Sequence, residues 1–226
     1  MSAPRVIAID GPAGAGKSSA SKELALRLGW YLLDTGAIYR TLALAARERG
    51  VSWDDEAALG RLALGLPIAF VRGEDGQAVL LDGRDVSVAI RTPEISDGAS
   101  RVSSKPAVRA ALLELQRELA QKGGCVVEGR DIGTVVLPWA PVKFFLTASP
   151  EERARRRHLE LLARGQPSDL PATLVEIVER DRRDASRDVA PMRAADDAMT
   201  LDSSTMSLDD VVATMERVAR ERLGIG

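Results

Sequence analysis

The sequence predicts an α/β fold in which helices flank a parallel sheet. Short apolar runs alternate along the chain with longer segments that carry apolar side chains at helical spacing. Strands that alternate with helices of about 10 to 20 residues are typical of parallel sheets. A glycine-rich turn directly follows the first apolar run, as it does where a strand leads into a ligand-binding loop.

The elements follow in order from the N-terminal end. Residues 5–9 (R-V-I-A-I) form the first expected strand, and residues 18–28 form a helix that ends at Gly29. A second strand is expected at 30–33, followed by a helix at 38–49 that ends at Gly50. Further strands are expected at 125–128, 143–147 and 199–202, and further helices at 108–121, 151–164, 174–187 and 208–223.

One segment departs from this alternation. Residues 67–72 and 78–81, joined by G-E-D-G, predict a β-hairpin, and 85–88 a short third segment. Antiparallel pairing does not belong in a parallel core. We therefore expect a single domain over 1–226, with a core of 1–61 and 93–226 and an inserted α+β subdomain at 62–92.

Composition excludes several classes of protein. The formal net charge is −2, which argues against a nucleic-acid-binding protein coated in positive charge. No apolar run approaches the ~20 residues of a membrane span, and the N-terminal run is too short for a signal peptide, so a cytoplasmic protein is expected. A single cysteine, Cys125, rules out an intramolecular disulfide and is expected to fill the core. The positive charge is uneven, with 26 arginines and 5 lysines.

Residues 11–18, G-P-A-G-A-G-K-S, carry the strongest motif. They fit G-x-x-x-x-G-K-[ST] between a strand and a helix. Glycines let backbone N–H groups point inward and form an anion nest at a helix N-terminus. Lys17 can reach the β- and γ-phosphates, and the Ser18 hydroxyl can ligate Mg²⁺. The motif predicts binding of a nucleoside triphosphate.

Three classes of triphosphate-binding protein then compete. A guanine-nucleotide switch needs an N-K-x-D element, which a chain without asparagine lacks. A motor or DNA-handling ATPase is usually longer and shows a hydrophobic strand that ends in a catalytic acidic pair. A small-molecule kinase needs arginines for its acceptor and an arginine-bearing lid, and this chain supplies both. A kinase for another small molecule, and a non-kinase ATP-dependent switch or interaction protein, remain as alternatives.

Two segments at strand ends are the expected acceptor site. D-T-G-A-I-Y-R (34–40) follows the second strand and E-G-R-D-I-G-T (128–134) follows a later one. Ligands of open α/β sheets bind beyond the carboxyl ends of the strands. Arg40 and Arg130, each expected in a glycine-containing turn, are therefore candidates to clamp a phosphate.

The combination of motifs resembles the bacterial cytidylate kinases, which are P-loop nucleoside monophosphate kinases. Besides the segments above, the resemblance is carried by I-R-T-P-E-I-S (90–96), A-P-V-K-F-F-L-T-A-S-P-E-E-R-A-R-R-R (140–157), R-D-R-R-D-A-S-R (180–187) and A-D-D-A-M-T-L-D-S-S (195–204). It covers nearly the whole chain. It implies transfer of the ATP γ-phosphoryl group to CMP or dCMP with Mg²⁺, an acceptor-binding insert, a lid at 150–168 and a monomer.

The resemblance also implies residue roles. The ATP-binding residues are Gly11, Pro12, Ala13, Gly14, Ala15, Gly16, Lys17, Ser18 and Ser19, with Arg153, Arg156 and Arg157 of the lid. The acceptor-binding residues are Thr35, Tyr39, Arg40, Ser100, Arg109, Arg130, Asp131, Arg180, Asp184 and Arg187. Catalysis is assigned to Lys17, Arg40, Arg130 and Arg157.

Chemistry accounts for several of these roles. Asp131 can accept a hydrogen bond from the cytosine N4 amino group, and Arg109 can donate to the acceptor edge of the base. Thr35 and Ser100 offer neutral partners, and Asp184 and Arg180 can hold the ribose hydroxyls. Glu128 stands where many relatives have Asp, which leaves open whether it reaches Mg²⁺ through water.

The helix at 151–164 carries four clustered arginines. Residues 153, 156 and 157 share one face, whereas Arg155 is expected to be a solvated residue that pairs with a neighbouring glutamate. His158, the only histidine, is not expected to be catalytic.

Overall fold

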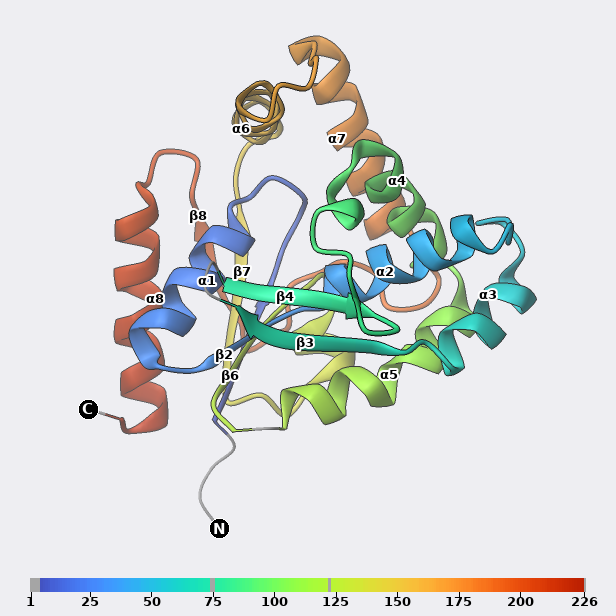
Figure 1. Cartoon of the computed structure of the whole chain (residues 1–226). Helices are drawn as coiled ribbons and strands as arrows, with labels where there is room; N and C mark the ends of the chain where they lie inside the picture. The colour runs from blue at the N-terminus through green and yellow to red at the C-terminus, as the bar shows by residue number, and fades with distance from the viewer. Residues whose placement is uncertain (1–4, 74–75, 122, 226) are drawn as a thin grey trace. The chain divides into compact units, whose positions relative to one another are not determined.

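The computed structural model describes residues 5–73, 76–121 and 123–225, and its chain forms two compact units (Figure 1). The first unit comprises Met1–Leu33 and Ala120–Gly226, and the second comprises Asp34–Leu119. The segment 62–92 lies inside the second unit. Its separation from a core of 1–61 and 93–226, and a lid at 150–168, stay predictions.

The first unit is built on a five-stranded sheet of order β2-β6-β1-β7-β8. β1 pairs in parallel with β6 and β7, and β7 pairs in parallel with β8, which confirms the predicted α/β fold. Each expected strand is present within one residue of its predicted bounds. The strands are β1 (Val6–Asp10), β2 (Tyr31–Asp34), β6 (Cys125–Glu128), β7 (Val142–Thr147) and β8 (Met199–Asp202).

Two helices pack together over this sheet and close its core. α1 (Lys17–Leu28) and α8 (Leu208–Leu223) contact each other, as Figure 1 shows at the side of the sheet. Leu24 of α1 and Met215 of α8 are fully buried with Phe144 of β7 in one apolar cluster. Burial of side chains this large contributes roughly 1.5–3 kcal/mol each.

Two further helices of the first unit follow β7. α6 (Pro150–Ala163) begins one residue before the expected helix, with Pro150 in its first turn, and Ser149 caps it by accepting the Glu152 N–H. α7 (Leu170–Ala185) begins four residues before the expected helix, because the Asp169 carboxylate accepts the Ala172 N–H and caps an earlier turn. α6 and α7 pack against each other beyond the end of β7 (Figure 1).

The second unit contains the predicted hairpin. β3 (Ile68–Gly73) and β4 (Gly76–Leu81) pair antiparallel, with Phe70 opposite Val79, and β5 (Arg84–Asp85) adds a short third strand. The third strand therefore begins one residue before the expected 85–88 and is shorter. Residues 74 and 75 of the expected G-E-D-G turn lie outside the described residues.

Helices make up the rest of the second unit. They are α2 (Thr35–Glu48), α3 (Glu56–Leu64), the 3₁₀ turn η1 (Ala89–Arg91), α4 (Pro93–Val102) and α5 (Pro106–Ala120). Sequence analysis missed α3 and α4. Both begin at a side-chain cap, where Asp55 accepts the Ala58 N–H and Thr92 accepts the Ile95 N–H. α4 also packs against Trp53, since a Cβ on Gly98 would lie 2.5 Å from the indole ring.

No helix within the described ranges is both long and apolar enough to cross a membrane.

Candidate active site

The loop between β1 and α1 has the conformation that the motif predicts. Gly11, Gly14 and Gly16 all adopt positive φ angles, and Gly16 caps the N-terminus of α1. At Gly11 a side chain is excluded twice over, because φ is 143° and a Cβ would lie 1.9 Å from the carbonyl oxygen of Leu146. The strand, loop and helix are thus confirmed at 6–28.

Lys17 lies inside this loop. Its Nζ donates to the carbonyl oxygen of Pro12 at 2.7 Å, and the side chain is buried. Burial lowers the pKa of the ammonium well below its usual value, and the positive charges of Arg130 and Arg180 act in the same direction. The negative charge of Glu128 opposes them. A bound phosphate at this position would stabilise the charged form of the Lys17 amine.

Ser18 and Glu128 meet at the loop. The Ser18 hydroxyl lies 3.0 Å from Oε2 of Glu128 and donates to it. Glu128 is the last residue of β6 and is buried, whereas Ser18 and its neighbour Ser19 are exposed in the first turn of α1. The longer side chain of Glu128 therefore does reach the hydroxyl expected to ligate a metal.

Asp10 ties the end of β1 to the segment that follows β6. Its two carboxylate oxygens accept the N–H groups of Ile132 and Gly133, each at 2.8 Å. These residues open a π-helical turn, η2 (Ile132–Val136), directly after Arg130 and Asp131. Burial raises the pKa of Asp10 to about 6, although both N–H groups act to lower it. Sequence analysis missed Asp10, whose only signal was a carboxylate placed where a buried strand meets the phosphate loop.

The structure brings together three of the predicted acceptor residues of the first unit. Nε of Arg130 donates to Asp184 at 3.0 Å, and Arg187 pairs with the other oxygen of the same carboxylate. Asp184 lies on α7 and is buried. Burial alone would raise its pKa, but the charges of Arg130, Arg187 and Arg180 together lower it. The carboxylate is therefore ionised among three guanidinium groups.

The four arginines of α6 have different surroundings. Arg155 is 57% exposed and makes a bidentate pair with Glu152, which confirms that it is a solvated residue. Arg157 pairs with Glu160 at the surface. Arg156 donates to the carbonyl oxygen of Ser203 at 2.6 Å and to its hydroxyl at 3.1 Å.

Arg153 is the buried member of this cluster, with only 4% of its side chain exposed. Its Nη1 donates to the carbonyl oxygen of Ala13 in the phosphate loop at 3.1 Å, and its Nη2 pairs with Asp181 of α7 at 2.6 Å. The side chain therefore contacts the backbone of the loop. Sequence spacing had placed it on the same helical face as Arg156 and Arg157.

His158 makes a local contact. Its Nδ1 lies 2.9 Å from the Ser168 hydroxyl, which in turn contacts the Thr173 hydroxyl at 3.2 Å.

The second unit holds the remaining predicted acceptor residues. Thr35 and Tyr39 are buried on the first turns of α2, and the guanidinium of Arg109 lies 5.7 Å from the centre of the Tyr39 ring. The hydroxyl of Ser100, on α4, is buried and has no hydrogen-bond partner among the described residues. Arg109 also donates to the carbonyl oxygen of Ser103.

Arg40 corrects one expectation. It does not lie in a glycine-containing turn after the strand, because Asp34 accepts the Ala37 N–H and starts α2 at Thr35. Arg40 is thus in the second turn of a helix, where its Nη2 donates to Asp34 at 2.5 Å. Its Nε is buried without a hydrogen-bond partner in the described part of the chain.

Comparison with known proteins shows which family this chain matches. The family model described as cytidylate kinase matches residues 7–221. The cytidylate kinase of Geobacter sp. (strain M21) is 52% identical over 221 residues, which are 98% of this chain and 95% of the relative. That of Pseudomonas paraeruginosa is 53% identical over 212 residues, 93% of each chain.

One solved structure shares the fold at low sequence identity. An uncharacterized protein from Eubacterium ventriosum superposes with a TM-score of 0.53 at 13% identity, over 96% of this chain and 99% of that one.

Proposed function

Because the chain belongs to the cytidylate kinase family, we propose that it transfers the γ-phosphoryl group of ATP to CMP or dCMP, giving ADP and CDP or dCDP. The observation that carries this proposal is the phosphate loop with its buried Lys17, in the same unit as the Arg130, Asp184 and Arg187 cluster. A kinase whose acceptor is a phosphate requires a loop that binds the phosphates of the donor nucleotide and a separate set of arginines for the acceptor.

ATP is bound by the loop of the first unit in this proposal. Backbone N–H groups of residues 11–19 surround the phosphates, and Lys17 exchanges the Pro12 carbonyl oxygen for phosphate oxygens. Arg156 and Arg157 neutralise charge on the transferred group from α6, and Arg153 acts on the loop through Ala13. Positioning and charge neutralisation supply most of the catalysis in phosphoryl transfer.

The Ser18 hydroxyl and the nearby Glu128 carboxylate supply oxygen atoms of the kind that ligate Mg²⁺. The described residues contain no group of three or more metal-ligating His, Cys, Asp or Glu side chains. Ser18 with the nearby Glu128 is instead a partial ligand set, suited to an ion that keeps several waters and takes phosphate oxygens. We propose that Ser18 ligates Mg²⁺ and that Glu128 holds a ligated water. When bound, the ion neutralises charge on the β- and γ-phosphates.

Acceptor-binding roles are proposed for residues within each unit, taken separately. In the first unit, Arg130 binds the acceptor phosphate, Asp184 with Arg180 and Arg187 orients the ribose, and Asp131 accepts from the cytosine N4 amino group. In the second unit, Arg40 binds phosphate. The other residues proposed there face the base and sugar: Thr35, Tyr39, Ser100 and Arg109.

The chemical step needs no covalent enzyme intermediate. An ionised oxygen of the acceptor phosphate forms the new bond to the γ-phosphorus. The bond from that phosphorus to the bridging oxygen of ATP breaks, and its electrons leave with ADP. Because the attacking oxygen is already ionised, no side chain has to remove a proton from it.

A coupled assay of ADP formation tests the proposal. ATP and Mg²⁺ are supplied with CMP, dCMP, UMP, AMP or shikimate in turn. We expect turnover with CMP and dCMP well above turnover with the others. Equal or faster turnover with UMP, AMP or shikimate would assign the chain to another acceptor. Slow hydrolysis that no acceptor stimulates would favour an ATP-dependent switch.

A further inference from the structure

Asp181 pairs with Arg153, and this contact leads to the phosphate loop. The Arg153 guanidinium bonds in three directions: Nη2 to Asp181 at 2.6 Å, Nη1 to the Ala13 carbonyl oxygen at 3.1 Å and Nε to the Ala148 carbonyl oxygen at 2.9 Å. A planar guanidinium fixes the directions of these bonds relative to one another. Movement of Asp181 is therefore transmitted to the loop backbone.

The loop end of this contact is tightly packed. A Cβ on Gly14 would lie 3.1 Å from both the Cβ and the carbonyl oxygen of Arg153, so the loop rests directly on α6 at this residue. The positions of the Ala13 carbonyl and of the Gly14 backbone therefore both depend on the position of Arg153. A loop that binds phosphate through backbone N–H groups depends on the orientation of these peptides.

The other end lies on the helix that carries the acceptor residues. Asp181 follows Arg180 directly and stands one helical turn before Asp184, which pairs with Arg130 and Arg187. A ligand that contacts Arg180 and Asp184 therefore contacts the same turn of α7 that carries Asp181. Arg155 and Arg157 of α6, by comparison, pair with glutamates of their own helix.

We propose that Asp181 is a positioning residue, which holds Arg153 against the Ala13 carbonyl. It thereby couples binding of the acceptor nucleotide by residues of α7 to binding of ATP by the phosphate loop. The inference rests on the proposed function for the identity of the two nucleotides. Coupling between two binding sites is reciprocal, so CMP should tighten ATP binding by the same factor as ATP tightens CMP binding.

Calorimetric titration of the full chain tests the proposal. The Kd of ATP is measured with and without CMP, in the presence of EDTA to prevent turnover, for the unsubstituted protein and for Asp181→Asn. Loss of a charge-assisted hydrogen bond should weaken ATP binding about tenfold. CMP should then no longer tighten it. Glu179→Gln is the matched control, because Glu179 is exposed on the same helix and loses the same charge.

A double substitution separates this role from a general loss of structure. Arg153→Lys keeps the charge but cannot make the three directed bonds, so it should also weaken ATP binding. Because Asp181 acts through Arg153, adding Asp181→Asn to Arg153→Lys should cause little further loss. Additive losses, an effect equal to that of Glu179→Gln, or unchanged ATP affinity in Arg153→Lys would each overturn the proposal.

The two proposals fail in different ways. If CMP is not the acceptor, the coupled assay fails, while the effect of Asp181→Asn on the Kd of ATP remains measurable. If the positioning role is wrong, CMP turnover persists and Asp181→Asn binds ATP like the unsubstituted protein. Should Asp181→Asn not fold, Asp181→Glu takes its place, because it keeps the charge but shifts the carboxylate by one methylene from its position against Arg153.

Discussion

The protein satisfies the polar groups of Lys17, Ser18 and Arg130 in the first unit more fully than two buried polar atoms of Ser100 and Arg40 in the second. In the first unit, charged groups bond to one another or to the backbone: Lys17 to Pro12, Ser18 to Glu128 and Arg130 to Asp184. In the second unit, the Ser100 hydroxyl and Nε of Arg40 are buried with no hydrogen-bond partner among the described residues. A buried polar group left in this state costs roughly 1–3 kcal/mol.

This difference bears on what each unit gains from a ligand. Lys17, Ser18 and Arg130 must exchange an internal partner for a nucleotide, so the net gain per contact is small and the geometry is set in advance. The Ser100 hydroxyl and Nε of Arg40 gain a partner without losing one. Selectivity for an acceptor is expected to depend strongly on such atoms, because the wrong ligand leaves them unpaired.

The largest effect is expected at Lys17. Lys17→Ala should lower kcat roughly 10²–10³-fold, the loss typical when one preorganised electrostatic contact is removed. The free energy of unfolding should not fall, because the substitution removes a buried ammonium whose pKa is already lowered. Steady-state kinetics and denaturant titration measure the two quantities. Lys22→Ala, exposed on the same helix, is the control, and retained activity in Lys17→Ala would remove the loop from the mechanism.

Asp10 should give the next largest effect, on stability. Its pKa of about 6 lies above the unfolded value of 3.8, so the native state binds the proton more tightly than the unfolded chain. The contribution of Asp10 to the free energy of unfolding is therefore greatest below pH 4 and falls by about 3 kcal/mol as the pH rises through 6. Denaturant titrations of the unsubstituted protein and Asp10→Asn at several pH values measure this. Parallel stability profiles would contradict it.

Substitution of Asp131 tests base recognition. Asp131→Asn replaces an acceptor-only carboxylate by a group that can also donate, so preference for CMP over UMP should fall by about 10- to 100-fold. The ratio of kcat/KM for the two acceptors measures this preference, and the KM for ATP should stay unchanged. If both acceptors lose activity equally, Asp131 has a structural role.

The smallest effect is expected at Ser100, where Ser103 offers a closely matched control. Ser100→Ala removes a hydroxyl without a partner, so the protein should unfold no more easily, while the KM for CMP should rise about five- to tenfold. Ser103→Ala is the matched control, because the Ser103 hydroxyl donates to the Ser100 carbonyl oxygen at 3.1 Å. It should cost about 1 kcal/mol of stability with little change in KM. The reverse pattern would show that the Ser100 hydroxyl does not face a ligand.

Local sequence patterns were sufficient for the strands of the first unit and the phosphate loop. The bounds of β6, β8 and α8 agree with the predicted ones, and α8 begins after a capping box at Ser207 and ends before Gly224. The start of α2 was predicted three residues late, since D-T-G-A-I-Y-R was interpreted as a loop when Asp34 in fact caps a helix. α3 and α4 were missed although both have side-chain caps.

The candidate site was less predictable for a physical reason. Helical spacing identifies residues 153, 156 and 157 as neighbours, but only packing against the phosphate loop and α7 buries Arg153 and leaves Arg157 at the surface. Asp10 was missed for the same reason, because both of its hydrogen-bond donors lie more than 120 residues away in the sequence.

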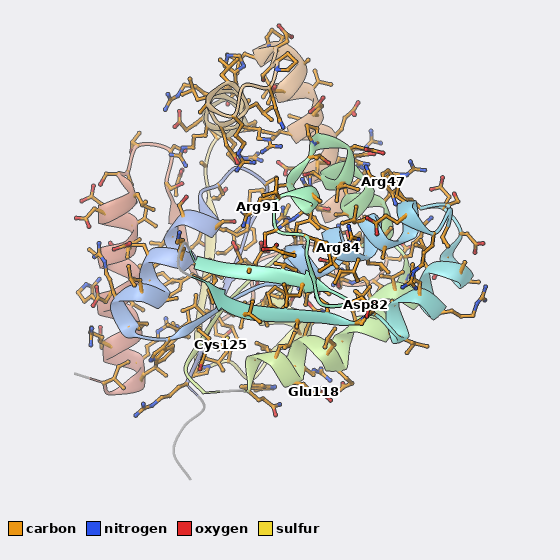
Figure 2. All side chains as sticks on the ribbon, viewed as in Figure 1. Arg47, Asp82, Arg84, Arg91, Glu118 and Cys125 are labelled. Atoms are coloured by element: carbon orange, nitrogen blue, oxygen red, sulfur yellow. The ribbon has the colours of Figure 1, made fainter. Side chains whose placement is uncertain are left out.

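The position of Cys125 makes it a reporter of stability. Labelled in Figure 2, it is the only cysteine, opens β6 opposite Val6 of β1, and is 2% exposed. Burial raises the pKa of its thiol to about 12, so almost no reactive thiolate exists in the native state. A thiol reagent can therefore modify Cys125 only when this part of the sheet opens. Where reclosing is faster than modification, the rate of labelling gives the free energy of that opening, with no substitution in the protein.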